Sequence, residues 1–425
     1  MQLFFVNTGY GECQILKSKS NNVTVIDGGP SDRETYKEVG TLRVNEALKL
    51  LNIDHINNLI CTHIHYDHIA GLCEISKDDE IKIDNFYINA LLPHNISNLE
   101  RPSCGLLNFE DFRLWKYSLK AYRNLISDLK RKNTHIREVL EKETLFLDED
   151  ASLEIFGLTE DSKKERLLNL EALNTNDDHE FIKALKILNQ KENQKSLFFI
   201  LNTKNYRALL TGDRQNFDDV KDRLPICDLL KVTHHGQKDG LPDLLLDKCH
   251  PHIFVICADL GKKYQSACDF IFEKCRDFCK KDQKEAKILV TGNLPSFDKK
   301  TPAILGFDDN LQIFYPIYAD HVLDDKDIVL DKIFIENKNT ISNEDNYDYD
   351  FEIVSLKSGE IFCKNFKVLG LTKSFSIKNL KKSPLKIFIR NFNNYLELSL
   401  FIKDIKDCIV ASDLLFFKEE LFKKS

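Results

Sequence analysis

The segment THIHYDHIAG, residues 62–71, carries three histidines and one aspartate within six positions. Alternate side chains at a strand end point to the same side, so His63 and His65 can face one point. Asp67 and His68 follow in the turn and can reach a second point about 4 Å away. Nitrogen and carboxylate ligands of this kind suit zinc, manganese or iron. A polar turn would explain a lone His-x-His pair, but the full cluster predicts a metal site.

Two later segments end in residues of the same kind. Asp213 closes the run ALLTGD, where one carboxylate could bridge two metal ions. The segment DLLKVTHHG presents His234 and His235 before a glycine. Adjacent side chains on an extended chain point to opposite sides, so one of these two histidines is expected to bind metal. Asp27, at the end of VTVIDGG, is expected to orient the ligands through hydrogen bonds.

Short apolar runs predict the strands that deliver these residues. The glycine-punctuated start LFFVNTGYGECQILKSKSNNVTVIDGG predicts three strands, and HINNLICTH, NFYINALLP, SLEIFGL, KSLFFILNTKNYRALLTGDR, DLLKVTHHG, HIFVICAD, KILVTG and LQIFYPIY predict the rest. Apolar positions at helical spacing predict helices at 34–52, 105–143, 160–192 and about 264–281. Strands that mix with helices in this way indicate an α/β (α+β) fold.

Length and composition set the organisation. A chain of 425 residues suggests two domains, and the alternating pattern after residue 318 predicts a small β-rich C-terminal domain at 319–425. The net charge of −7 excludes a protein that coats nucleic acid, although a nuclease needs only a local positive rim. The 12 cysteines lack paired spacing and lie partly in apolar runs, which indicates reduced thiols and a cytoplasmic protein. No apolar run is long enough to predict a membrane span.

The motifs VNTGYGECQI, VIDGG, THIHYDHIAG, NQKSLFFILNTKNYRALLTGD and DLLKVTHHGQ, in this order, resemble the metallo-β-lactamase superfamily. The last two resemble in particular its ComEC-like branch, the soluble hydrolase region attached to bacterial DNA-uptake channels. The resemblance implies an αββα sandwich over residues 1–318 with helical inserts at about 95–150 and 160–190. It also implies one or two divalent ions, with zinc or manganese favoured, at one edge of two facing sheets.

The same resemblance implies site residues and roles. The implied metal ligands are His63, His65, Asp67, His68, Asp213 and His234 or His235, of which we assign His234 to the metal. Asp67 would also orient a metal-bound hydroxide, and His235 would contact the substrate or protonate the leaving group.

The chain departs from the pattern of the resemblance at three positions. The ComEC-like branch often carries aspartate where this chain has His65, so the first cluster is closer to the general superfamily. Asn193 stands where a further histidine ligand is usual, so it is expected beside the ligands with Asp27, and His94 or His179 could replace that ligand. Gln237 stands where a serine is usual after the histidine pair, which leaves a phosphate contact by that hydroxyl open.

Three functions fit these observations. A metal-dependent phosphodiesterase or nuclease acting on nucleic acid or nucleotide phosphodiesters is favoured, and basic residues of the segment 105–143 could face such a substrate. The alternatives are a hydrolase of another ester or amide (lactone, thioester or phosphorylcholine ester), or a non-catalytic metal-binding module of a multiprotein bacterial system. The C-terminal domain is a candidate surface for a protein partner, and no membrane association is expected.

Overall fold

The structure is a computed structural model that describes residues 1–32, 35, 40–92, 110–258, 265–292 and 302–318, and the backbone of four strands beyond residue 365. The chain divides into two compact units, one of residues 1–292 and 303–317 and the other of residues 293–302 and 318–425. In the second unit the described strands form two antiparallel pairs, β16 (Phe366–Lys367) with β17 (Ser374–Phe375) and β18 (Leu385–Phe392) with β19 (Tyr395–Ile402). The rest of the predicted C-terminal domain lies outside the described residues.

The first unit contains two mixed sheets. The first sheet consists of β1 (Gln2–Val6), β2 (Gln14–Lys17), β3 (Val23–Ile26), β4 (His55–Cys61), β5 (Lys82–Ile88), β6 (His135–Glu138), β14 (Pro302–Phe307) and β15 (Ile313–Tyr318). Its strands lie in the order β15-β14-β1-β2-β3-β4-β5-β6. The second sheet consists of β7 (Lys142–Asp148), β8 (Ala151–Phe156), β9 (Phe198–Thr203), β10 (Arg207–Leu210), β11 (Leu229–Lys231), β12 (Ile253–Ile256) and β13 (Lys287–Val290). Its strands lie in the order β13-β12-β11-β10-β9-β8-β7.

The two sheets share one apolar core. Phe5 and Ile26 of the first sheet belong to the same buried cluster as Leu153, Phe199 and Val255 of the second. The core forms because each strand places apolar side chains on its inner face, which removes them from water. Two facing sheets with added helices agree with the predicted metallo-β-lactamase type of sandwich.

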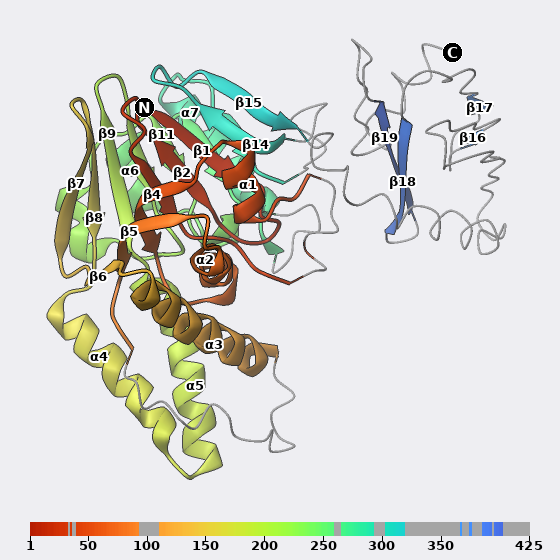
Figure 1. The fold of residues 1–425 in the computed structure, drawn as a ribbon. Coiled ribbons are helices and arrows are strands. Elements are labelled where there is room, and N and C mark those ends of the chain that lie inside the picture. The colour runs from red at the N-terminus through yellow and green to blue at the C-terminus, as the bar shows by residue number, and fades with distance from the viewer. Residues whose placement is uncertain are drawn as a thin grey trace. The chain divides into compact units, whose positions relative to one another are not determined.

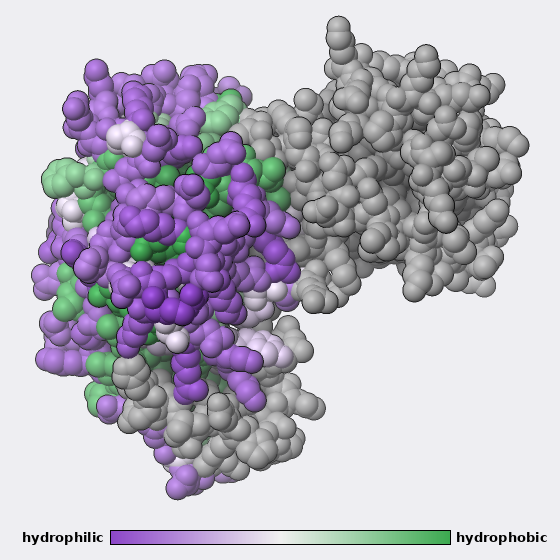
Figure 2. Space-filling model, viewed as in Figure 1, coloured by the Kyte–Doolittle hydropathy of each residue, from purple (hydrophilic) through white to green (hydrophobic). Residues whose placement is uncertain are grey.

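Seven α-helices lie in the described part of the first unit: α1 (Val44–Leu50), α2 (Tyr66–Lys77), α3 (Glu110–Arg131), α4 (Glu160–Glu171), α5 (Asp178–Glu192), α6 (Asp243–Cys249) and α7 (Asp269–Lys281). Figure 1 shows α4 and α5 as a pair that extends away from the sheets, with α3 between this pair and α2. The visible face of this unit is mostly hydrophilic (Figure 2). None of the described helices is long and apolar enough to cross a membrane. The cysteines in the described ranges are all free, and all but Cys268 are buried.

The helix predicted over 105–143 is wrong beyond Arg131. The helix α3 ends at Arg131, and the strands β6 and β7 follow it. Asn133 adopts a positive φ of 59°, a conformation that ends helices and that asparagine tolerates. In β7 the side chains alternate between exposed and partly buried, so the segment follows the period of a strand. The helices predicted at 160–192 are confirmed as α4 and α5.

A glycine contact fixes α2 against the loop after β3. A β-carbon on Gly71 would lie 1.8 Å from the carbonyl oxygen of Gly28, so only glycine fits there. The amide of Gly28 donates to the carbonyl of His68 at 2.8 Å, and the amide of Gly71 donates to the carbonyl of Gly29 at 2.9 Å. The first turn of α2 therefore lies directly on the loop that contains Asp27.

Candidate metal centre

Loops at the ends of several strands bring the candidate residues to one edge of the two sheets. The loop after β3 carries Asp27, and the turn between β4 and α2 carries His63 and His65. From the second sheet, the loop after β10 carries Asp213 and the turn after β11 carries His235. Neighbouring strands in each group run parallel, so their carboxyl ends meet at the same edge.

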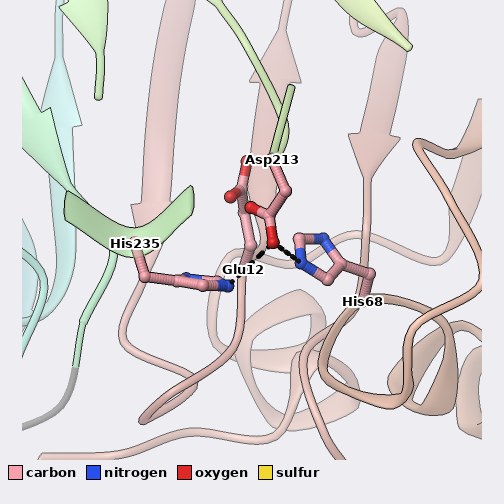
Figure 3. A group of neighbouring side chains, drawn as sticks. All are labelled: Glu12, His68, Asp213 and His235. Atoms are coloured by element: carbon pink, nitrogen blue, oxygen red, sulfur yellow. Dashed lines mark hydrogen bonds and ion pairs between the residues drawn. The ribbon is translucent and has the colours of Figure 1, made fainter. Parts of the chain in front are cut away.

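Asp213 lies at the centre of this group. Its Oδ2 atom is 3.3 Å from Nε2 of His68, 3.5 Å from Nε2 of His235 and 4.0 Å from Nε2 of His63. The Nε2 atom of His235 is also 3.3 Å from Oδ2 of Asp67. Figure 3 shows His68 and His235 pointing at Asp213 from opposite sides. One carboxylate oxygen thus faces three imidazoles, two from the segment 62–71 and one from the turn after β11.

His63 and His65 form a second half of the site next to Asp213. The Nε2 atom of His63 lies 3.0 Å from Nδ1 of His65. On its other side, Nδ1 of His63 lies 3.0 Å from the hydroxyl of Thr62 and 3.2 Å from the hydroxyl of Ser196. These contacts fix the ring of His63, so that its Nε2 atom stays close to the ring of His65.

Asp27 contacts Thr62 and His68. Its carboxylate accepts hydrogen bonds from the amide of Thr62 at 2.8 Å and from the hydroxyl of Thr62 at 2.6 Å. The Oδ2 atom also lies 2.7 Å from Nδ1 of His68. A carboxylate on the outer nitrogen of a histidine leaves the other nitrogen free to bind a metal and fixes the orientation of the ring. The role of Asp27 in orienting metal ligands stays a prediction.

The sequence did not point to Glu12 or Lys231. Glu12 is fully buried, and one ligand-type atom from each of Glu12, His68, Asp213 and His235 lies within 4.8 Å of the others. Glu12 pairs with the ammonium of Lys231, which also donates to the carbonyl of Gly212 at 2.9 Å. A lysine within the apolar run LLKV was the available signal, because a buried lysine needs a carboxylate partner.

The structure brings His235, and not His234, to the other candidate ligands. His234 and His235 have φ values of 47° and 52°, so the chain turns sharply there and the alternation expected of an extended strand does not apply. His235 is buried, and its Nδ1 atom lies 3.0 Å from the carbonyl oxygen of Cys257. His234 instead lies within 3.1 Å of side-chain atoms of Gln215, Asn193 and Asp239.

The missing histidine ligand has no replacement among the described residues. Asn193 contacts His234, with 3.0 Å between Nδ2 of the asparagine and Nε2 of the histidine. His179 is exposed in the first turn of α5, at the opposite end of that helix from Glu192, and does not join the cluster. His94 lies outside the described residues. Gln237 is half-buried and ends the turn that contains the two histidines.

The site concentrates negative charge in a buried place. Burial would raise the pKa of Asp213, but His235 and His68 outweigh this effect and hold that pKa well below its usual value. Burial likewise opposes ionisation of Asp67, yet His68 and His235 lower its pKa to about 2. Burial lowers the pKa of His235, and the carboxylates of Asp213 and Asp67 more than reverse this and raise it to about 10. Carboxylates that hold protons on imidazoles in this way also favour a divalent cation at the same place.

The donor set fits a metal ion. Buried polar atoms normally have a partner, but Oδ1 of Asp213 and Nε2 of His65 have no hydrogen-bond partner among the described residues. Imidazole nitrogens and carboxylate oxygens are the ligands that zinc and manganese accept. One cation would be held by Asp67, His68 and His235, and a second by His63 and His65. Asp213 lies beside both groups.

Comparisons with known proteins support the resemblance drawn from the motifs. Residues 12–83 match the family model of the metallo-β-lactamase superfamily. A comparison with curated proteins finds no match.

Solved structures with a similar arrangement include the following three. The metallo-β-lactamase fold protein YhfI of Bacillus subtilis is 9% identical, with 68% of this chain and 96% of that chain covered and a TM-score of 0.36. Zinc-bound PqqB of Methylobacterium extorquens is 10% identical, with 69% and 98% covered and a TM-score of 0.36. A diphosphatase from the PhnP family is 12% identical, with 60% and 85% covered and a TM-score of 0.32. Likenesses of this size carry no inference about activity.

Proposed function

We propose that this protein is a metal-dependent hydrolase, and that its substrate is a phosphodiester of a nucleic acid or nucleotide. The observation that carries the proposal is the position of Asp213, whose Oδ2 atom lies within 4.0 Å of imidazole nitrogens of His63, His68 and His235. A buried carboxylate between two groups of histidines would help to hold one or two divalent cations. A divalent ion at such a site makes a water molecule acidic enough to act as a nucleophile at neutral pH.

The protein's own residues would orient the reaction. Asp67 is 19% exposed, whereas His63 and His68 are fully buried, so its carboxylate is the group among these three best placed to meet a water molecule and a substrate. Asp27 keeps the ring of His68 in one orientation. His234 is half-buried next to His235, with 6.4 Å between the ring centroids, and would be the candidate to protonate a leaving group. This exchanges the roles of His234 and His235 relative to the assignment made from the sequence.

A phosphodiester is favoured over other esters because of charge. Two neighbouring cation positions can neutralise both non-bridging oxygens of a phosphoryl group as it is attacked. Hydrolysis of a lactone, thioester or other carboxylic ester develops one oxyanion only, and one cation suffices to stabilise it. The pairing of the two groups around Asp213 therefore supports the phosphodiester.

The test compares Asp67→Ala with Asp79→Ala. Asp67 lies in the first turn of α2, whereas Asp79 follows the end of that helix. The side chain of Asp79 is 76% exposed and pairs with Arg131. We expect wild type and Asp79→Ala to bind zinc or manganese and to cleave bis-p-nitrophenyl phosphate, DNA or RNA. Asp67→Ala should lose about a hundredfold or more in rate, because it removes a proposed metal ligand that also orients the attacking water.

Two other results would redirect the proposal. Bound metal without cleavage of any phosphodiester, but with turnover of a carboxylic ester or lactone, would replace the proposed substrate class. No bound metal in the wild-type protein, measured by mass spectrometry after dialysis against Zn²⁺ or Mn²⁺, would overturn the hydrolase itself.

A further inference from the structure

A buried ion pair joins the two helices of the second insert. Arg166 lies on α4 and Glu192 ends α5, and each of them is 1% exposed. The guanidinium holds the carboxylate at two points, with Nη2 2.5 Å from Oε1 and Nε 3.1 Å from Oε2. Two charges leave water only at a large desolvation cost, so a pair of this kind is weak evidence for stability and raises the question of what it positions.

The pair touches the turn that carries two candidate metal ligands. The Oε1 atom of Glu192 also accepts a hydrogen bond from the backbone amide of Ile64 at 3.3 Å. Ile64 lies between His63 and His65. Arg166 in turn donates from Nη1 to the carbonyl of Ala90 at 3.2 Å, just beyond β5. The insert is therefore bonded to the backbone on which His63 and His65 are mounted.

The helix α3 also contacts the turn that carries His63 and His65. The ring of Trp115 packs edge-on against the ring of His65, with 5.7 Å between their centroids. The indole nitrogen of Trp115 donates to Oδ1 of Asn189 on α5 at 2.8 Å. Trp115 is 1% exposed, so the helix presents its largest side chain inward. Both inserts thus converge on the histidine turn and on each other.

The other half of the site is held by different groups. His68 is bonded to Asp27, and His235 is bonded to the carbonyl of Cys257. The start of α2 is fixed by its contact with Gly28. These partners come from the loop after β3 and from the end of β12.

We propose that Arg166, Glu192 and Trp115 are positioning residues for the His63–His65 half of the metal centre, an inference that rests on the proposed metal-dependent function. This half has two histidines and a share of Asp213. Because this half has few ligands, its affinity for a divalent ion depends on how well those ligands are held before the ion binds. Ligands that become ordered only on binding cost free energy. The inserts supply this order through the amide of Ile64 and the ring of His65.

The experiment uses the full chain with Arg166→Met and Glu192→Leu combined. Replacing a buried ion pair by apolar side chains of similar volume leaves no isolated charge and is compatible with folding. The double variant removes the acceptor for Ile64 while it keeps the interior filled. Glu192→Gln is the second variant, which keeps the shape and removes the charge. Glu180→Gln, an exposed position of α5 that pairs with Lys183, is the matched control.

Binding of Co²⁺ is measured by calorimetry and by visible absorption, after circular dichroism has established that each variant is folded. His65→Ala and Asp67→Ala identify which ion belongs to which half. We expect the double variant to weaken the ion lost in His65→Ala by about tenfold to a hundredfold, the size of effect of residues that orient ligands. The ion lost in Asp67→Ala should change by less than about twofold, as should both ions in Glu180→Gln.

Three outcomes would overturn the positioning role. Unchanged affinity at both positions in a folded double variant would show that the pair does not act on the ligands. Equal weakening at both positions would show a general structural role. No Co²⁺ bound by the wild-type protein would remove the proposed function together with this inference, which separates that failure from the other two.

Discussion

At the scale of single residues, the site is organised around Asp213. Its carboxylate is 3% exposed, lies beside three imidazoles and is 3.9 Å from the ammonium of Lys231. A carboxylate in this position stays ionised despite burial, because the surrounding positive charge stabilises it more than burial opposes it. It is therefore the residue on which both halves of the proposed centre depend.

The neighbouring histidines His234 and His235 make a matched pair for a first prediction. His235→Ala should remove a ligand and lower the affinity for Zn²⁺ by at least about tenfold, because its Nε2 atom faces Asp67 and Asp213. His234→Ala should leave the affinity nearly unchanged, because its ring contacts Gln215, Asn193 and Asp239. Competition with a chromophoric chelator measures both values. The opposite ranking would return the ligand role to His234.

At the scale of elements, the start of α2 depends on close packing of backbone. The structure explains the glycines of the motifs DGG (27–29) and DHIAG (67–71), because Gly71 lies against the carbonyl of Gly28. This contact places the first turn of α2, and with it Asp67 and His68, next to Asp27.

Gly71→Ala should lower the free energy of unfolding by about 1–3 kcal/mol, the usual cost of forcing a methyl group into a filled space. The displaced helix should also weaken metal binding, because Asp67 and His68 would move with it. Urea unfolding measures the stability, and Lys77→Ala on the exposed end of the same helix is the control, expected within about 0.5 kcal/mol of wild type. A fully stable Gly71→Ala protein would contradict the close packing.

The pair of inserted helices carries a charge interaction that depends on pH. Glu165 on α4 lies 2.5 Å from the ammonium of Lys191 and 2.7 Å from that of Lys195. Hydrogen bonds with these two lysines lower the pKa of Glu165 from 4.5 to about 2. A lowered pKa means that the stabilisation is present above pH 4.5 and is lost as the pH falls toward about 2.

Glu165→Gln should therefore be less stable than wild type near pH 6, and the difference should shrink as the pH falls below 4.5. The difference is small because the side chain of Glu165 is 44% exposed and solvent screens the charges. Urea unfolding at a series of pH values between 6 and 3 measures it, and 0.5 M salt should reduce it further. A difference that grows toward low pH would exclude this origin.

At the scale of the whole molecule, all the candidate ligands belong to the first compact unit. A chain that ends after Tyr318, the last residue of β15, keeps both sheets of that unit. We expect such a chain to bind the same number of Zn²⁺ ions as the full chain, measured by mass spectrometry on the purified protein. The full chain is the control. Loss of an ion on truncation would mean that the second unit supplies a ligand. A protein partner for residues 319–425 remains a prediction.

The sequence by itself predicted the sandwich, the strand ends and most of the candidate ligands. Apolar runs of strand length end at Asp27, His63 and Asp213, and in an α/β sheet such ends gather at one edge. The match of the family model to residues 12–83 agrees with the motifs. These features are local, because a strand and the loop that follows it are encoded by consecutive residues.

Only the tertiary structure decided which residues meet. The partnership of Glu12 with Lys231 joins positions 219 residues apart, and no local pattern specifies it. The choice between His234 and His235 follows from two left-handed residues in a tight turn, which the alternation rule cannot anticipate. The bond from Ile64 to Glu192 depends on how a long insert folds back onto the sheets. Contacts of this kind arise from the packing of whole elements, so they become visible only when the elements are placed in space.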